Sequence, residues 1–173
     1  MLSPPLAHDG TERRLGRPQE AAAQQASYRG KKSDHTVNKV LLVTALLVIL
    51  LLSDPHSGRG HERRLAAPTP SPLPAGRGLL QALGFLAFTL PEVERRMPTT
   101  KPRGAGLTLE QQRATQALHQ WRRIEHVNSS VKRCCMVQDR SRRWQEGVRD
   151  LVMELCCALH NVRVRRSPWQ PMM

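Results

Sequence analysis

An uninterrupted apolar run constrains the fold of this chain more than any other feature. It covers residues 40–52, which read VLLVTALLVILLL and include no charged side chain. A helix that spans a bilayer needs about 20 apolar residues, so this run is short for that role. Two buried strands, roughly Val37–Val43 and Leu46–Ser53, account for it, although Thr44-Ala45 is poor turn chemistry. We predict the two strands, and a single-pass membrane anchor is the alternative.

The rest of the chain predicts further strands and then helices. Residues 79–90 are apolar enough for a strand and its continuation. A further strand is predicted at residues 92–97, closed by Pro98. Thr108 is a good N-cap, and Gln111 completes a capping-box pattern, which predicts a helix from Leu109 to about Lys132. An order of strands followed by helices indicates an α/β or α+β plan.

A second helix is predicted from Arg142 to about Val162. Apolar side chains recur there at the spacing of one helical face, which predicts a core-facing stripe. The stripe consists of Trp144, Val148, Leu151, Val152, Leu155 and Leu159.

The charge of the chain favours a polyanionic partner. Lys and Arg number 27 against 14 Asp and Glu, giving a formal net charge of +13. Such an excess is typical of proteins that bind nucleic acid, and less so of proteins that bind membranes. The four cysteines form two adjacent pairs, Cys134-Cys135 and Cys156-Cys157, without the spacing of zinc sites. We interpret them as reduced thiols, which indicates an intracellular, reducing compartment.

One acid stands alone in the strongly basic segment Arg122–Arg133. Glu125 and Lys132 are seven residues apart, so two helical turns place them on one face, about 10 Å apart. A salt link within the helix explains Glu125 poorly, because Trp121 and Ser129 offer no cation at the i±4 positions. We therefore predict that Glu125 holds a metal ion while the surrounding cations hold a polyanion.

Several short segments of the chain resemble segments of one known family and occur in the same order as in that family. They are His8-Asp9-Gly10-Thr11-Glu12-Arg13, Arg17-Pro18, Tyr28-Arg29-Gly30-Lys31-Lys32, His35-Thr36, Leu83-Gly84-Phe85, Arg123-Ile124-Glu125-His126 and Leu159-His160-Asn161. On these segments the chain resembles the catalytic part of DDE-type transposases of bacterial insertion sequences, also called DDE superfamily endonucleases and similar to Harbinger-type nucleases. The resemblance implies an α/β fold, namely a ribonuclease-H-like mixed sheet with C-terminal helices. This chain is expected to form either the whole of that fold or an incomplete version of it.

The resemblance also implies a site for two divalent metal ions, Mg²⁺ or Mn²⁺. The family's first catalytic Asp ends the first core strand in a D-G-T-like motif, which corresponds to Asp9. Its third acid belongs to a Y-x2-R-x3-E-x6-K pattern. Glu125 and Lys132 match the E-x6-K half, whereas Trp121 stands where the pattern has Arg. We therefore expect Asp9 and Glu125 to be catalytic and to bind metal.

The second acid of the family pattern is lost. The family's D-x-[GA]-[YF] pattern aligns with residues 82–85, so Ala82 stands in place of Asp. The His-Asp pair that relatives often carry is His61-Glu62 here. Glu62, or Asp54, replaces the missing ligand only if a loop moves. We therefore expect impaired activity.

DNA, as transposon ends and target, is the partner that the resemblance implies, with a second copy of the chain as a further candidate. The expected DNA contacts are Lys31, Lys32, Arg122, Arg123, Lys132, Arg133, Arg142 and Arg143. We expect a basic segment with the first core strand at residues 1–36, the catalytic core at 37–166 and a tail at 167–173. The expected location is the bacterial cytoplasm, at the nucleoid. A non-catalytic, basic DNA-binding remnant is the alternative function.

Overall fold

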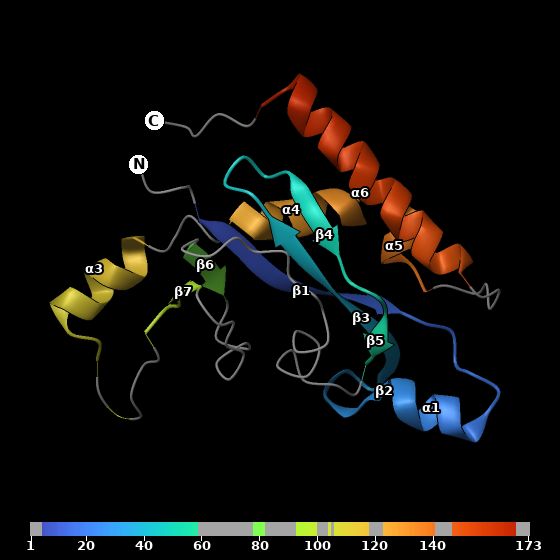
Figure 1. Cartoon of the computed structure of the whole chain (residues 1–173). Coiled ribbons are helices and arrows are strands. Elements are labelled where there is room, and N and C mark those ends of the chain that lie inside the picture. The colour runs from blue at the N-terminus through green and yellow to red at the C-terminus, as the bar shows by residue number, and fades with distance from the viewer. Residues whose placement is uncertain are drawn as a thin grey trace.

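The computed structural model describes residues 5–58, 78–81, 93–99, 104, 106–117, 123–140 and 147–168. Its first half contains β1 (Leu6–Arg14), α1 (Ala21–Ser27), β2 (Tyr28–Arg29), the short 3₁₀ helix η1 (Gly30–Lys32), β3 (Asp34–Val43), β4 (Ile49–Leu52) and β5 (His56–Ser57). There follow β6 (Gly78–Gln81), β7 (Glu94–Arg96), α3 (Leu109–Ala117), α4 (Arg123–Lys132), α5 (Cys135–Gln138) and α6 (Val148–Arg166). Strands precede the larger helices, which confirms the predicted α/β plan (Figure 1).

The strands form one mixed sheet with β1 inside it. The main path of the sheet is β2-β3-β1-β6-β7, and β4 and β5 also pair with β3. β1 is antiparallel to β3 along most of its length, whereas β6 runs parallel to β1 and β7 parallel to β6. The mixed sheet followed by C-terminal helices is consistent with the ribonuclease-H-like expectation.

The apolar run forms two strands, as predicted. β3 and β4 pair antiparallel, and residues 44–48 make the turn between them. The Thr44 hydroxyl accepts a hydrogen bond from the Val48 amide at 3.1 Å, and Leu47 adopts a left-handed φ of 65°. A threonine side chain and one strained leucine thus supply the turn that the sequence seemed to lack.

The alternative of a membrane anchor through residues 40–52 is wrong, because this segment is part of the sheet. Within the described ranges, none of the helices combines the length and the apolar character that crossing a membrane requires.

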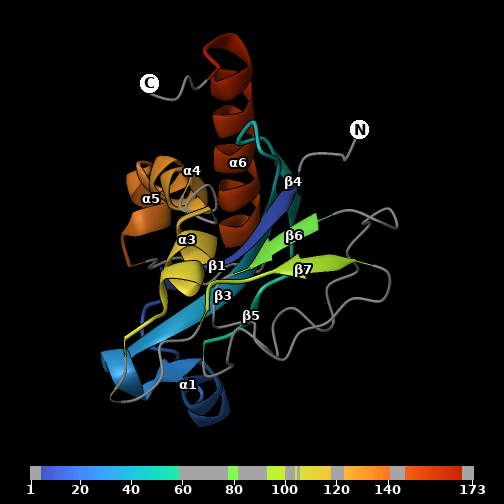
Figure 2. The same ribbon diagram turned by 90° about the vertical axis from the view of Figure 1, so that its left-hand side faces the viewer.

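The main core lies between the sheet and the C-terminal helices. Leu41 and Val43 alternate with Leu42 along β3, so they face opposite sides of the sheet. On the helix side they meet Ile124, Val127 and Val131 of α4 and Met153 of α6. Figure 2 shows α4, α5 and α6 together on one side of the sheet. β1 is therefore covered by α4, and this contact positions the site described below.

The single helix predicted from Leu109 to Lys132 is replaced by two, α3 and α4, with residues 118–122 outside the described part. The start of α3 is as predicted. The Thr108 amide donates to Gln111 Oε1 at 3.1 Å, and the Gln111 amide donates to Thr108 Oγ1 at 3.3 Å. This reciprocal pair is the expected capping box.

The predicted core stripe of the last helix is wrong at its leucines, although Val152 packs against the core. Leu151, Leu155 and Leu159 are exposed, and Trp144 lies outside the described residues. The hydrogen bonds from His160 to Leu47 and from Asn161 to Ile49 fix the rotation of α6. The face that they turn inward consists of Met153, Cys156, Cys157, His160 and Val164.

Candidate functional site

Asp9, the predicted first acid, lies on the interior strand β1. Its backbone pairs with Leu41 of β3. The parallel pairing of β1 with β6 reaches His8, which is opposite Gln81, so Asp9 is the next residue beyond it. The prediction that the strand ends at the Asp is wrong, because β1 continues to Arg14.

The Asp9 carboxylate is held against helix α4. Its Oδ2 accepts a hydrogen bond from Asn128 Nδ2 at 2.8 Å, and its Oδ1 accepts one from the Gly10 amide at 2.8 Å. Asn128 Oδ1 is buried and has no hydrogen-bond partner among the residues that the structure describes. Asn128 lies one turn after Glu125 on the same flank of α4. Sequence reasoning missed Asn128, although its i+3 spacing from Glu125 could have indicated it.

Glu125, the predicted third acid, is exposed on α4. Lys132 belongs to the same helix, so the predicted shared flank of these two residues is confirmed. Among the described residues, no three His, Cys, Asp or Glu side chains are grouped so that they could hold a metal ion. Two other predicted positions, Glu62 and Ala82, lie outside the described part of the chain. The structure thus brings Asp9 to the helix that carries Glu125.

Lys132 lies where the end of α4 meets β1 and η1. Burial lowers the pKa of Lys132, and the positive charge of Lys32 lowers it further. The negative charges of Glu12 and Asp9 act in the opposite direction on the same pKa. Lys132 is therefore a partly desolvated cation beside the Asp9 carboxylate, and an additional anion at this point would favour its charged form.

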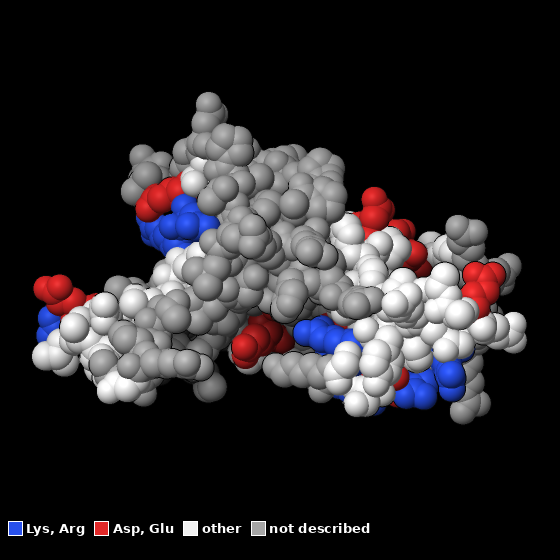
Figure 3. All heavy atoms as spheres, turned by 90° about the horizontal axis from the view of Figure 1, so that it is seen from below, with Lys and Arg blue, Asp and Glu red and all other residues white. Residues whose placement is uncertain are grey.

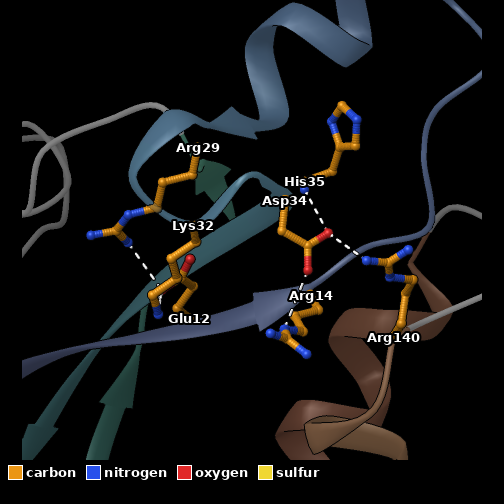
Figure 4. Close-up of polar contacts among 7 residues, drawn as sticks. All are labelled: Glu12, Arg14, Arg29, Lys32, Asp34, His35 and Arg140. Atoms are coloured by element: carbon orange, nitrogen blue, oxygen red, sulfur yellow. Dashed lines mark hydrogen bonds and ion pairs between the residues drawn. The ribbon is translucent and has the colours of Figure 1, made fainter.

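Glu12 is the centre of an ion-pair cluster at the η1 end of the sheet (Figure 4). Its Oε2 contacts Lys32 Nζ at 2.6 Å and Arg29 Nη1 at 3.0 Å. Burial raises the pKa of Glu12, but the hydrogen bond from Lys32 and the charges of Arg29 and Lys32 outweigh it, so the pKa lies below its usual value. Lys32, a predicted DNA contact, is thus paired with an internal acid.

A second cluster lies beside the first (Figure 4). Asp34 contacts Arg14 at 3.3 Å and Arg140 at 2.8 Å. Two other cations, unlike Arg14 and Arg140, are buried. Lys39 pairs with Asp150 at 3.0 Å, and Arg13 donates to the Met136 carbonyl. Part of the basic excess therefore joins the sheet to the helices and does not face solvent.

The other predicted DNA contacts are dispersed. Arg123 is half-buried at the start of α4, and Arg133 is exposed just after its end. Arg122, Arg142, Arg143 and the side chain of Lys31 lie outside the described part. Figure 3 shows Lys and Arg interspersed with Asp and Glu on the face that it views. The described residues on that face do not make one continuous basic surface.

The family resemblance is confirmed by comparison with known protein families. The family described as DDE superfamily endonuclease matches residues 8–161. The chain belongs to the DDE superfamily endonucleases. The match extends from the residue before Asp9 to Asn161 on α6, so it includes β1, α4 and the site between them. Neither the curated proteins nor the solved structures contain a significant match to this DDE superfamily endonuclease.

The donor chemistry at Asp9 suits a hard divalent cation. Mg²⁺ and Mn²⁺ prefer oxygen ligands such as carboxylates and amide carbonyls. In this DDE superfamily endonuclease, the Asp9 carboxylate of β1 and the Asn128 amide of α4 lie together, and α4 also carries Glu125. A buried amide oxygen without a hydrogen-bond partner is costly, and a cation is one means of satisfying it.

Proposed function

We propose that this chain is the catalytic domain of a DNA transposase, which hydrolyses phosphodiester bonds and transfers DNA strands with the aid of divalent metal. One observation carries the proposal: the 2.8 Å hydrogen bond between Asp9 and Asn128 holds the first acid against the helix of the third. Family membership supports it. The loss of the second acid at Ala82 impairs the activity. The core comprises β1 together with residues 37–166.

Asp9, Glu125 and Asn128 are the residues that would hold Mg²⁺ or Mn²⁺. When bound, such an ion activates the attacking oxygen and stabilises the leaving oxygen in phosphodiester cleavage. Asn128 orients the Asp9 carboxylate through its amide. Lys132, beside Asp9, binds a DNA phosphate, because an incoming anion offsets the desolvation of its ammonium group.

Restoring the second acid tests the proposal. Purified chain is incubated with Mg²⁺ and labelled transposon-end DNA. We expect Ala82→Asp to raise the rate of nicking about 100-fold or more over the native chain, because a third carboxylate completes the metal ligands. Adding Asp9→Asn to Ala82→Asp should abolish nicking. Asp139→Asn, at an exposed acid that is not among the proposed metal or DNA ligands, is the matched control and should not change it.

A metal-binding measurement tests the same site without catalysis. Titration with Mn²⁺, followed by electron paramagnetic resonance, should show binding that is lost in Asp9→Asn. Asn128→Asp should tighten it about tenfold, because it adds a carboxylate next to Asp9. If Asn128→Leu binds Mn²⁺ as well as the native chain does, the role proposed for Asn128 is wrong.

A non-catalytic DNA-binding remnant is the second candidate function. The observation in its favour is that no group of three metal-binding side chains is found within the described ranges. The Ala82→Asp variant separates the two candidates. Nicking that requires Asp9 supports the decayed enzyme, whereas salt-dependent DNA binding without nicking in that variant supports the remnant.

A further inference from the structure

Helix α6 carries an exposed apolar stripe along its outer face. Leu151 is 54% exposed, Leu155 55%, Leu159 68% and Val162 51%. Their spacing of i, i+4, i+8 and i+11 places them on one side of the helix. Single exposed leucines need no explanation, but a stripe that covers most of a helix about 28 Å long marks an interaction surface.

The stripe cannot turn inward, because the opposite face of α6 is anchored. Asn161 Nδ2 donates to the Ile49 carbonyl at 2.9 Å, and Asn161 Oδ1 accepts from the Ile49 amide at 2.8 Å. His160 Nε2 bonds to the Leu47 carbonyl at 2.9 Å. Met153 and Cys157 are buried on this anchored face. Figures 1 and 2 both show α6 at the outside of the molecule.

Glu154 and the arginines at the end of α6 lie in different halves of the helix. Its first half contains Arg149, Asp150 and Glu154, of which Asp150 pairs with Lys39, and Arg163, Arg165 and Arg166 lie at the end. Glu154 and Arg165 are eleven residues apart, so they differ by only about 20° around the helix and flank the same side of the stripe. Neither forms an ion pair with any residue that the structure describes.

We propose that this stripe is the interface with a second copy of the chain, in which two α6 helices pack antiparallel about a two-fold axis. With the axis near Ala158 and Leu159, Leu155 packs on Val162 of the second copy. Glu154 then lies beside Arg165 of the second copy, within about 3 Å along the helix. A two-fold interface repeats both contacts.

Charge complementarity is what selects this occupant. Antiparallel pairing places Glu154 of each helix beside Arg165 of the other, and it also opposes the two helix dipoles favourably. Parallel pairing would place Glu154 beside Glu154 and Arg165 beside Arg165. DNA does not suit the stripe, because phosphates gain nothing from four apolar side chains. The second copy thus supplies both the apolar surface and the opposite charges.

The first test compares masses in solution. Sedimentation of the full chain from about 1 µM to about 100 µM should show a monomer–dimer equilibrium. The double change Leu155→Glu and Leu159→Glu should raise the dimer Kd about 100-fold or more. Leu109→Glu is the matched control, because Leu109 is 72% exposed on α3 and should leave the Kd unchanged. Circular dichroism checks that each variant is folded.

The second test exchanges the flanking charges. Glu154→Arg and Arg165→Glu should each raise the dimer Kd about tenfold. Each variant places two like charges side by side at positions 154 and 165, and the two-fold axis repeats this contact. The double exchange should return the Kd to within about threefold of the native value. A monomer throughout the concentration range, an unchanged Kd in the leucine variant or a double exchange that fails to restore pairing would each overturn the proposal. Mn²⁺ binding reports separately on the nuclease site.

Discussion

His8, the residue before the proposed catalytic Asp9, is a buried titratable group in the sheet. It is 5% exposed, and burial lowers its pKa from 6.5 to about 4. Because the folded pKa lies below the unfolded one, folding favours the neutral ring. The contribution of His8 to the free energy of unfolding is therefore fully present above about pH 6.5. As the pH falls toward about 4, this contribution decreases by roughly 3 kcal/mol.

The measurement is urea denaturation of the native chain and of His8→Asn at several values between about pH 7.5 and about pH 4.5. Asn cannot titrate, yet it offers an acceptor to Gln81, whose side chain lies 3.3 Å from His8 Nδ1. The free energy of unfolding should fall more steeply with acidification in the native chain than in the variant. Equal slopes would show that His8 is not the source of the pH dependence.

Individual site residues were predictable to different degrees. Asp9 and the Glu125–Lys132 spacing follow from short motifs, and the residue types themselves indicate metal and phosphate chemistry. Asn128 and Glu12 do not follow from short motifs. Asn128 contacts Asp9, and Glu12 contacts Arg29 and Lys32, only in the folded chain. The contact between Asp9 and Asn128 joins residues 119 apart in the chain. No local sequence pattern predicts a contact over this separation.

At the scale of elements, Asn161 is the main link between α6 and β4. Its side chain bonds to both the amide and the carbonyl of Ile49, as a neighbouring strand would. We expect Asn161→Ala to lower the free energy of unfolding by about 2 kcal/mol, because two backbone groups lose their partners. Chemical denaturation measures this loss.

Asn161→Asp is the informative companion variant. An ionised carboxylate still accepts from the Ile49 amide, but it faces the Ile49 carbonyl with a second acceptor. Its destabilisation should therefore shrink at acidic pH, where the protonated acid can donate. If Asn161→Asp and Asn161→Ala show the same pH dependence, the two-bond link is not what stabilises this helix.

Strands were easier to predict than the orientation of helices. The apolar run must be buried, and its two halves lie in β3 and β4, on either side of the turn at residues 44–48. The leucines of the last helix predict a different inward face from the observed one, which carries Cys156, Cys157 and His160. Hydrogen bonds from His160 and Asn161 to the turn and to β4 decide the rotation. Hydrophobic periodicity contains no information about these partners.

At the scale of the whole molecule, only part of the net charge of +13 is available to a partner, because some cations are buried or paired with acids. Arg13 and Lys39 are buried among backbone carbonyls and acids, and Glu12 and Asp34 each contact two cations. A charge count from sequence therefore predicts the class of partner but not the surface that binds it. The excess that remains still repels itself in the compact state, so a polyanion should stabilise the fold.

We expect duplex DNA or heparin to raise the melting temperature of the chain at low salt. A polyanion at 100 times its Kd adds about 2.7 kcal/mol, which corresponds to a rise of about 5–10 °C at this chain length. Raising the salt from about 50 mM to about 200 mM should remove most of the rise, because counterion release drives the binding. An uncharged polymer such as dextran is the control. A melting temperature that DNA leaves unchanged at low salt would contradict the nucleic-acid partner, whatever the state of the metal site.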